Sequence, residues 1–279
     1  MARRVAITGA GGQLGRRLVE AYAGAADEVL ALSRPEFDIT DAAHHERLAA
    51  WHPDLVINAA AWTDVDACAR EPERAMRING GAAGEVAAAA ARADAMVIQV
   101  STNEVFDGAL ERPYREDDAT NPINPYGASK LAGERLVAKA NPRHLIVRTA
   151  WLHDPERETG FPSRIRAAAE RAQEAGQPLR VVADEWGNPT PVTWLSIAIR
   201  AITDRRPETT VLHVAGWPPA TRFDWAREEL REVEIRIEPM RLADFRRDSR
   251  VPPRAVLDLA RLQQLGIEPV DWRLPGGRA

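Results

Sequence analysis

Short runs of apolar residues recur through the first 150 positions of the chain, and a stretch with helical character follows each of them. The runs are rich in valine and isoleucine and lack polar alternation, as expected of strands that are buried on both faces. Strands that alternate with helices form right-handed crossovers and a parallel sheet, which predicts a doubly wound α/β fold. The expected strands are residues 5–8, 29–32, 55–57, 96–100 and 145–147, and the expected helices are residues 13–23, 42–51, 72–93 and 126–140.

The regular alternation ends near residue 150, and prolines interrupt the pattern beyond it. We interpret residues 1–150 as one domain and residues 151–279 mainly as a smaller, irregular lobe that binds the substrate, with some of its segments returning to the sheet. Helices are expected in this lobe near residues 162–175, 192–204, 221–232 and 257–265.

Composition argues against several classes of function. The 279 residues carry a net charge of −4 with acidic and basic residues mixed, which provides no basic face for nucleic acid. Cys68 is the only cysteine, so an internal disulfide is impossible and a reducing cytoplasm fits. We expect no signal peptide, no membrane span and no contact with a membrane. No group of residues has metal-ligand spacing, and His44, His45 and His52 are expected to be solvated on or near a surface helix.

Three glycines follow the first expected strand and open the first helix. Gly9, Gly12 and Gly15 have the spacing G-x-x-G-x-x-G, which differs from the G-x-G-x-x-G of ordinary dinucleotide-binding folds. Glycines let the backbone approach a pyrophosphate closely, and the helix N-terminus faces its charge. We therefore expect a dinucleotide to bind at these glycines and at Gln13 and Leu14, with a purely structural turn as the alternative.

The end of the second expected strand bears on which dinucleotide is bound. An acidic residue about 20 positions past the glycines would bind a ribose 2′-hydroxyl, but Arg34 lies there instead. Because arginine can bind a 2′-phosphate, the sequence favours NADP(H) over NAD(H); a solvated surface charge is the alternative reading of Arg34. Asp38 and Ile39 are candidates to border the adenine, although a helix N-cap at Thr40 or Asp41 explains this segment equally well.

Tyr126 and Lys130 form a Tyr-x-x-x-Lys pair in a chain whose only other lysine is Lys139. Residues four apart on a helix share a face, so the phenol and the ammonium are expected to point into one site. A nearby cation would lower the pKa of the tyrosine toward the working pH. Thr102 follows the fourth expected strand, at the edge of the sheet where ligands bind, and its hydroxyl is a candidate to hydrogen-bond a substrate carbonyl.

With these motifs in this order, the chain resembles the extended short-chain dehydrogenase/reductases, and among them most of all the dTDP-4-dehydrorhamnose reductases. The resemblance is carried by residues 8–15, 58–66, 101–108, 124–134, 148–151 and 184–190. It implies a Rossmann-like sheet whose first domain binds NADP(H), with Ala59, Ala60 and Ala61 beside the ribose and nicotinamide. It also implies reduction of the 4-keto group of a dTDP-4-keto-6-deoxy sugar, in which Thr102, Tyr126 and Lys130 are catalytic.

The substrate pocket departs from the family's pattern. Asn103 and Glu104 replace an Asp-Tyr pair, and a late segment, residues 250–258, lacks the family's serine. Residues expected to line the pocket, or to meet the base or the diphosphate of a nucleotide sugar, are Asn103, Glu104, Trp151, Phe161, Trp186 and Arg254.

Other readings stay open at this point. They are another nucleotide-sugar 4-ketoreductase, an epimerase, a dehydratase, and a non-catalytic regulatory protein that binds NADP(H). A dehydratase is disfavoured because the Asn103 amide cannot donate a proton as an acid. The expected partner is a small nucleotide sugar, and a homodimer is possible.

Overall fold

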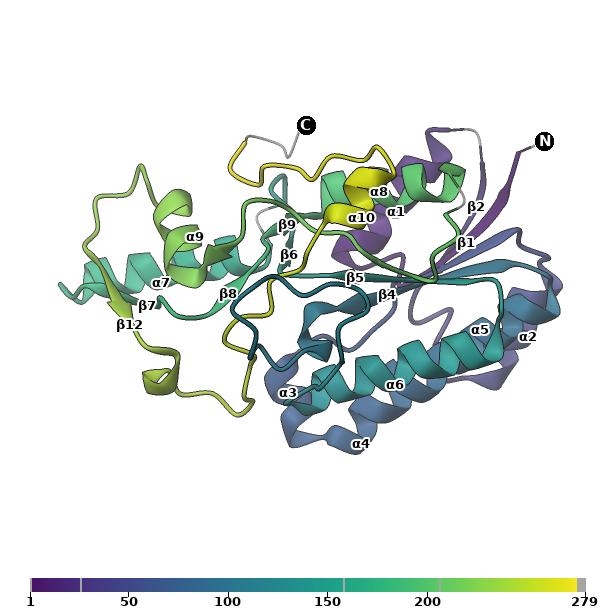
Figure 1. The fold of residues 1–279 in the computed structure, drawn as a ribbon, viewed down its shortest axis with the longest axis horizontal. Helices are drawn as coiled ribbons and strands as arrows, with labels where there is room; N and C mark the ends of the chain where they lie inside the picture. Colours follow the sequence, from purple (N-terminus) through teal and green to yellow (C-terminus); the bar gives the residue numbers. More distant parts are fainter. Residues whose placement is uncertain (1, 26, 158, 206, 275–279) are drawn as a thin grey trace.

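The computed structural model describes residues 2–25, 27–157, 159–205 and 207–274, which fold around one parallel sheet (Figure 1). Its strands are β1 Arg4–Thr8, β2 Glu28–Leu32, β3 Leu55–Asn58, β4 Met96–Thr102, β5 His144–Thr149 and β10 Val211–His213. They pair in the order β10-β5-β4-β3-β1-β2, and every pairing is parallel. The predicted α/β class with a parallel sheet is therefore confirmed.

Helices cover both faces of this sheet, as a doubly wound fold requires (Figure 1). The main covering helices are α1 Gln13–Ala23, α2 Ala42–Ala50, α5 Ala82–Arg92, α6 Pro125–Ala140 and α8 Val192–Arg205. Side chains alternate between the two faces along each strand. Val5 and Ile7 pack toward α1 and α8, whereas Ala6 packs toward α2, α5 and α6. Burial on both faces explains why the strands are apolar without alternation.

The sheet extends from β1 in two directions: β2 pairs with one edge of β1, and β3 pairs with the other edge. The strand order therefore reverses between β1 and β3. In open parallel sheets, ligands bind beyond the carboxyl ends of the strands at such a reversal. The glycine turn follows β1, and residues 59–61 follow β3. Both segments therefore border the same crevice.

The region after residue 150 contributes both to the sheet and to a second group of elements. α8 and β10 return to the sheet and α10 Ala260–Gln264 packs beside them, while the elements of a separate hydrophobic cluster gather at one end of the molecule (Figure 1). The hydrophobic cluster of this lobe is formed by α7 Phe161–Glu174, β7 Leu179–Val182, α9 Arg222–Glu229 and β12 Ile237–Met240. The short elements are β6 Leu152–His153, β8 Trp186–Gly187, β9 Thr190–Pro191, β11 Ala220–Thr221, the 3₁₀ helix η3 Leu242–Asp244 and α10 Ala260–Gln264. The division into two domains at residue 150 stays a prediction.

Two local features differ from the sequence-based expectation. The segment expected to be one helix over residues 72–93 consists of α4 Pro72–Ala75, the π-helical turn η1 Met76–Gly81 and α5. A separate short helix, α3 Val65–Arg70, precedes it. The prediction that His45 is solvated is wrong. Its side chain is buried and its Nε2 lies 2.8 Å from the carbonyl oxygen of Ile39, a partner that a sequence pattern does not reveal.

Candidate active site

At the edge of the crevice, the backbone of the glycine turn after β1 is in close contact with other backbone segments. Gly9 has a φ of 69°, and a Cβ atom there would lie 2.7 Å from the backbone nitrogen of Ala60. A Cβ atom at Gly15 would lie 2.0 Å from the carbonyl oxygen of Gly9. Both positions therefore exclude any side chain.

The N-terminus of α1 has no side-chain cap and can therefore receive an anion. Gly12 is its N-cap, and no side chain caps the first turn. The first N–H groups of a helix have no acceptor within the helix, and in α1 they belong to Gln13, Leu14 and Gly15. Together with the helix dipole, these groups favour a phosphate.

Arg34 and Asp38 lie near each other beyond the end of β2. Asp38 Oδ1 accepts hydrogen bonds from the backbone nitrogen and the Oγ1 of Thr40, at 2.8 and 2.7 Å. These bonds hold the pKa of Asp38 low, and the charge of Arg34 lowers it further. Ile39 is buried in the hydrophobic cluster on the α2 face. Asp41 is the N-cap of α2, so the capping alternative is confirmed for that residue. Arg34 itself is exposed.

Thr102 and Tyr126 meet at the carboxyl edge of the sheet. Thr102 is the last residue of β4 and Tyr126 lies in the first turn of α6, and the Thr102 hydroxyl is close enough to the phenol to lower its pKa. Both residues are buried, with 6% and 9% of their surface exposed. α6 is set in place by its N-cap, since Asn124 Oδ1 accepts a hydrogen bond from the Gly127 nitrogen at 2.7 Å. Sequence reasoning overlooked Asn124 as the cap, although an asparagine before proline is a usual start of a helix.

The pKa of Tyr126 is raised above its ordinary value, and the prediction that Lys130 lowers it is wrong for the chain by itself. Burial is the main cause, the Glu104 carboxylate adds to it, and the nearby Thr102 hydroxyl opposes it. Lys130 does not offset these effects, because its Nζ donates a hydrogen bond to the carbonyl oxygen of Val100 at 2.7 Å. The phenol is therefore protonated at neutral pH, which suits a proton donor.

Lys130 is itself buried, and burial lowers its pKa to about 8, while the Glu134 carboxylate one turn later opposes the shift. Glu134 forms a buried ion pair with Arg148 of β5, with 2.7 Å between Oε2 and Nη2. Ser101 Oγ also donates a hydrogen bond to Glu134 Oε1 at 2.5 Å. These contacts tie α6 to β4 and β5.

A chain of buried polar side chains, which sequence reasoning missed, connects the glycine turn with Lys130. Thr8 Oγ1 donates to Asn58 Oδ1 at 2.5 Å, and Asn58 Nδ2 donates to Gln99 Oε1 at 2.7 Å. Gln99 Nε2 then donates to the Val100 carbonyl oxygen at 2.9 Å, the same oxygen that binds Lys130. The sequence offered one sign of this chain of hydrogen bonds, namely a polar residue in each of three otherwise apolar strands.

Asn103 and Glu104 lie in η2 Asn103–Val105, a 3₁₀ turn directly after β4. Asn103 is buried, and its Nδ2 donates to the carbonyl oxygen of Ala255 at 2.9 Å. Glu104 is partly buried, and its Oε2 accepts a hydrogen bond from Asn124 Nδ2 at 2.6 Å. Burial raises the pKa of Glu104 to about 7; the bond from Asn124 opposes this, and the Glu185 carboxylate adds to it.

Three arginines of the second lobe form a cluster near Glu104, and sequence reasoning named none of them. Partial burial lowers the pKa of Arg164, and the positive charges of Arg222 and Arg247 lower it further. Arg222 and Arg247 also act on the pKa of Glu104. Arg222 Nη2 donates to the buried Glu185 at 3.1 Å. Mutual repulsion among three guanidinium groups favours an anion between them.

The aromatic residues expected in the substrate pocket fall into two groups. Trp151 and Phe161 pack around Trp225, with ring centroids 5.8 and 4.7 Å from its ring, and the Arg222 guanidinium lies 3.6 Å from the Trp151 ring. The Arg254 guanidinium lies 4.8 Å from the ring of Trp186. Arg254 Nε is buried and has no hydrogen-bond partner among the described residues.

Comparisons with known proteins place this arrangement in a family. The sequence model described as the RmlD substrate binding domain matches residues 3–275. The chain belongs to this family. A dTDP-4-dehydrorhamnose reductase from Mycolicibacterium smegmatis is 41% identical over 280 residues, which cover 98% of this chain and 84% of that protein.

Solved structures agree with this RmlD assignment. The crystal structure of a dTDP-4-dehydrorhamnose reductase from Clostridium acetobutylicum matches with a TM-score of 0.91 and 31% identity, over 97% of this chain and 95% of that one. The corresponding protein from Bacillus anthracis, in complex with NADP, matches with a TM-score of 0.89 and 28% identity, over 99% of this chain and 98% of that one. The predicted family is confirmed, and with it an NAD(P)-dependent oxidoreductase.

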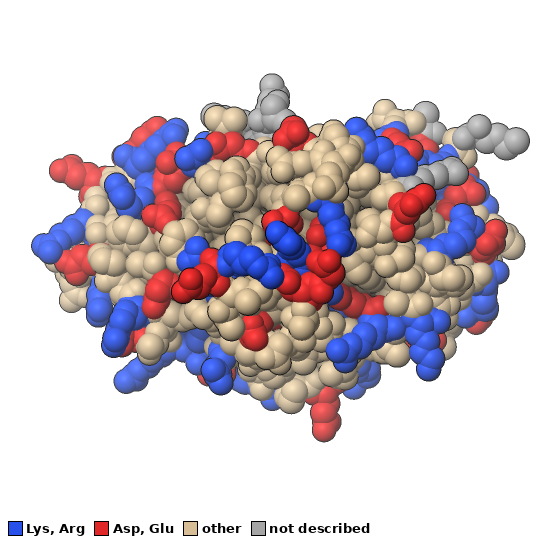
Figure 2. All heavy atoms as spheres, in the orientation of Figure 1, with Lys and Arg blue, Asp and Glu red and all other residues tan. Residues whose placement is uncertain are grey.

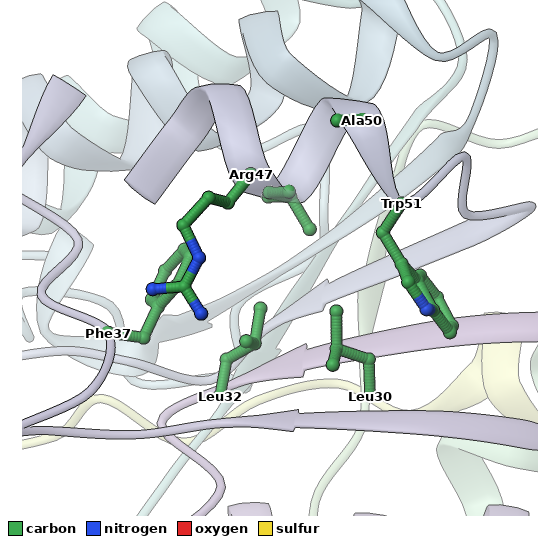
Figure 3. A pocket seen from close by; sticks show the side chains of 7 residues that line it. Leu30, Leu32, Phe37, Arg47, Ala50 and Trp51 are labelled. Atoms are coloured by element: carbon green, nitrogen blue, oxygen red, sulfur yellow. The ribbon is translucent and has the colours of Figure 1, made fainter. Parts of the chain in front are cut away.

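Among the described residues, the other surfaces of this RmlD-family chain add no second site of comparable chemistry. A hollow of about 360 Å³ lies between β2 and α2, with Leu30 and Leu32 as its floor and Phe37 and Trp51 at its ends (Figure 3); it contains none of the expected site residues. Acidic and basic side chains are interspersed over the face in Figure 2. Within the described ranges, no His, Cys, Asp and Glu cluster is built to hold a metal, and no helix has the length and apolarity to cross a membrane.

Proposed function

We propose that this chain uses NADPH to reduce C4 of dTDP-4-dehydrorhamnose, forming dTDP-L-rhamnose. The observation that carries the proposal is that the Thr102 hydroxyl and the Tyr126 phenol meet at the carboxyl edge of the sheet that the glycine turn also borders. The sugar is inferred from the relatives, among which the 41% identical protein is named for this reaction.

The residues around the crevice fit a phosphorylated dinucleotide. The α1 N-terminus lacks a side-chain cap, and close backbone contacts leave no room for a side chain at Gly9 and Gly15. When bound, the cofactor supplies the hydride, while the protein supplies position and electrostatics. The residues proposed to hold it are Gly9, Gly12, Gln13, Leu14 and Gly15 at the pyrophosphate, Arg34 at the 2′-phosphate, Asp38 and Ile39 at the adenine, and Ala59, Ala60, Ala61, Tyr126 and Lys130 at the ribose and nicotinamide.

Tyr126 donates its proton to the oxygen that becomes the C4 hydroxyl. Its raised pKa keeps the phenol protonated until negative charge develops on the substrate oxygen. Thr102 hydrogen-bonds the same oxygen and holds it in line with the phenol. The Lys130 ammonium leaves the Val100 carbonyl for a ribose hydroxyl, where its charge stabilises the phenolate that proton transfer produces.

We assign the nucleotide sugar to the lobe of residues 151–279 and NADP(H) to residues 1–150. Arg164, Arg222 and Arg247 repel one another in the free chain, and a diphosphate among them would remove that repulsion. Trp151 and Phe161 border Arg222 and are proposed to shape the nucleotide side of the pocket. The remaining proposed pocket residues are Asn103, Glu104, Trp186 and Arg254.

Reduction is favoured over elimination by the environment of Asn103. Loss of a hydroxyl group as water needs an acid at that step. The Asn103 amide cannot supply a proton, and its Nδ2 is already bound to the Ala255 carbonyl oxygen.

The test is incubation with NADPH and dTDP-4-keto-6-deoxy-L-mannose, followed by identification of the sugar formed. We expect NADPH oxidation with dTDP-L-rhamnose as product, and Tyr126→Phe should bind NADPH normally but lose most turnover. Turnover of this variant within a few-fold of wild type would remove Tyr126 from its role. No oxidation with any 4-keto sugar nucleotide would favour a non-catalytic NADP(H)-binding protein.

A further inference from the structure

Asn103 lies directly after Thr102 at the carboxyl end of β4, and only 3% of its surface is exposed. Its Oδ1 accepts a hydrogen bond from Thr102 Oγ1 at 3.3 Å, and its Nδ2 donates to the carbonyl oxygen of Ala255 at 2.9 Å. Because the side chain is buried and both polar atoms of its amide are bound within the chain, Asn103 has little surface left for a ligand. It connects two parts of the proposed site instead.

The backbone at Arg254, the residue before Ala255, is held from two further directions. The backbone nitrogen of Trp186 donates to the Pro253 carbonyl oxygen at 2.7 Å, and Trp186 and Arg254 form a parallel bridge. A Cβ atom at Gly108 would lie 2.8 Å from the backbone nitrogen of Arg254, so the segment also lies directly against this glycine. The place from which the Arg254 side chain extends is therefore fixed.

The Arg254 guanidinium lacks an acceptor. It lies 4.8 Å from the Trp186 ring, and its Nε is buried without a hydrogen-bond partner among the described residues. A buried N–H group without an acceptor is costly. Trp186 also pairs with Thr221 of β11, the residue before Arg222, so Arg254 and an arginine of the cluster flank the same strand β8. An acceptor oxygen of a ligand in this part of the pocket would satisfy the group.

We propose that Asn103 is a positioning residue for substrate recognition, an inference that rests on the nucleotide-sugar part of the proposed function. Its amide fixes the Ala255 carbonyl and so holds Arg254 at Trp186, where the guanidinium donates a charge-assisted hydrogen bond to an oxygen of the nucleotide sugar. Since Asn103 also binds Thr102, the catalytic hydroxyl and the guanidinium share one support. The family's pattern has an aspartate here, and an ionised carboxylate has no N–H to offer the Ala255 carbonyl.

The test is a double-mutant cycle on equilibrium binding of dTDP-L-rhamnose, measured by calorimetry with saturating NADP⁺. Asn103→Ala removes the support, and Arg254→Met removes the guanidinium but keeps an apolar side chain on Trp186. Each single variant should raise Kd roughly tenfold, about the effect of one charge-assisted hydrogen bond. The double variant should bind within about twofold of Arg254→Met, whereas two independent residues would together weaken binding about a hundredfold. Binding is measured instead of turnover because Asn103 also contacts the catalytic Thr102.

Controls separate a specific loss from a general one. Asn121→Ala, the same change at an exposed asparagine, should bind dTDP-L-rhamnose as wild type does, and every variant should keep the wild-type Kd for NADPH. Asn103→Ser takes the place of the alanine variant in the cycle if that variant does not fold.

Unchanged affinity for dTDP-L-rhamnose in either single variant, or a double variant whose loss equals the product of the single losses, would overturn the inference. Wild type that does not bind dTDP-L-rhamnose would overturn it as well. If wild type binds this ligand but oxidises no NADPH with the 4-keto sugar, the proposed reaction fails, while the cycle still decides the role of Asn103.

Discussion

The buried ion pair between Glu134 and Arg148 fastens the catalytic helix to the sheet, and we predict that breaking it destabilises the fold strongly. Each side chain is only 6% exposed, and 2.7 Å separates Oε2 from Nη2. Glu134→Gln preserves the shape but leaves the guanidinium charge buried without a carboxylate. Removal of one partner from a buried pair costs about 3–5 kcal/mol in the free energy of unfolding.

Urea unfolding followed by circular dichroism measures this loss directly. In a protein of this size about 1 kcal/mol shifts Tm by ~2–4 °C, so Glu134→Gln should lower Tm by roughly 6–20 °C. Glu46→Gln is the matched control. It removes an exposed pair with Arg92, whose side chains are 76% and 45% exposed, and it should cost about 0–1 kcal/mol.

A double variant separates charge from shape. Glu134→Leu combined with Arg148→Met leaves neither charge buried, and it should recover much of the stability that Glu134→Gln loses. A loss below about 1 kcal/mol in Glu134→Gln would refute the reasoning, because that is the range of a solvated pair. A double variant as unstable as the single one would show that shape, and not an uncompensated charge, sets the cost.

Three further predictions address the cofactor turn and the charged groups. Gly15→Ala places a Cβ atom 2.0 Å from the Gly9 carbonyl oxygen. The variant should lose about 1–3 kcal/mol in the free energy of unfolding, measured with urea, and should bind NADPH more weakly in calorimetry. An unchanged affinity for NADPH would contradict a cofactor role for the turn. Arg34→Ala should weaken NADPH binding roughly tenfold and leave NADH binding unchanged, whereas equal weakening of both would argue against a 2′-phosphate contact. The pKa of Glu104 is raised from 4.5 to about 7 on folding, so its stabilising contribution is complete below 4.5 and is lost as pH rises to about 7. As pH rises across that window, the free energy of unfolding of Glu104→Gln should therefore increase relative to that of wild type. A difference in the free energy of unfolding that does not change with pH would contradict the raised pKa.

The elements of the first half could be predicted because one physical cause acts along each of them. Strands such as β1 and β3 are buried on both faces, and that burial leaves a continuous apolar run in the sequence. The glycine turn was predictable for a similar reason, since close backbone contact at Gly9 and Gly15 permits no other residue. In both cases the structural requirement applies to each residue separately, and so it is visible in the sequence.

Features that depend on how a residue packs against its surroundings, and not on its own type, were missed. The π-helical turn η1 interrupts a segment that has the composition of a continuous helix. Arg164, Arg222 and Arg247 come from three different segments, and nothing in their local sequence distinguishes them from the many other arginines. His45 is buried through a contact with a carbonyl oxygen six residues earlier.

The error about Tyr126 has the same origin and is the most informative. Helical spacing correctly implied that Lys130 lies on the same side of α6, but it could not supply the competing acceptor, the Val100 carbonyl oxygen on β4. That oxygen holds the ammonium, while Glu104 from η2 and burial together raise the pKa of the phenol. Under the proposed function, Lys130 must exchange this carbonyl for a ribose hydroxyl before its charge can assist the phenol. Tyr126 is then a stable acid in the free chain and becomes an effective proton donor only when the cofactor is bound, which limits proton transfer to complexes that can also transfer hydride.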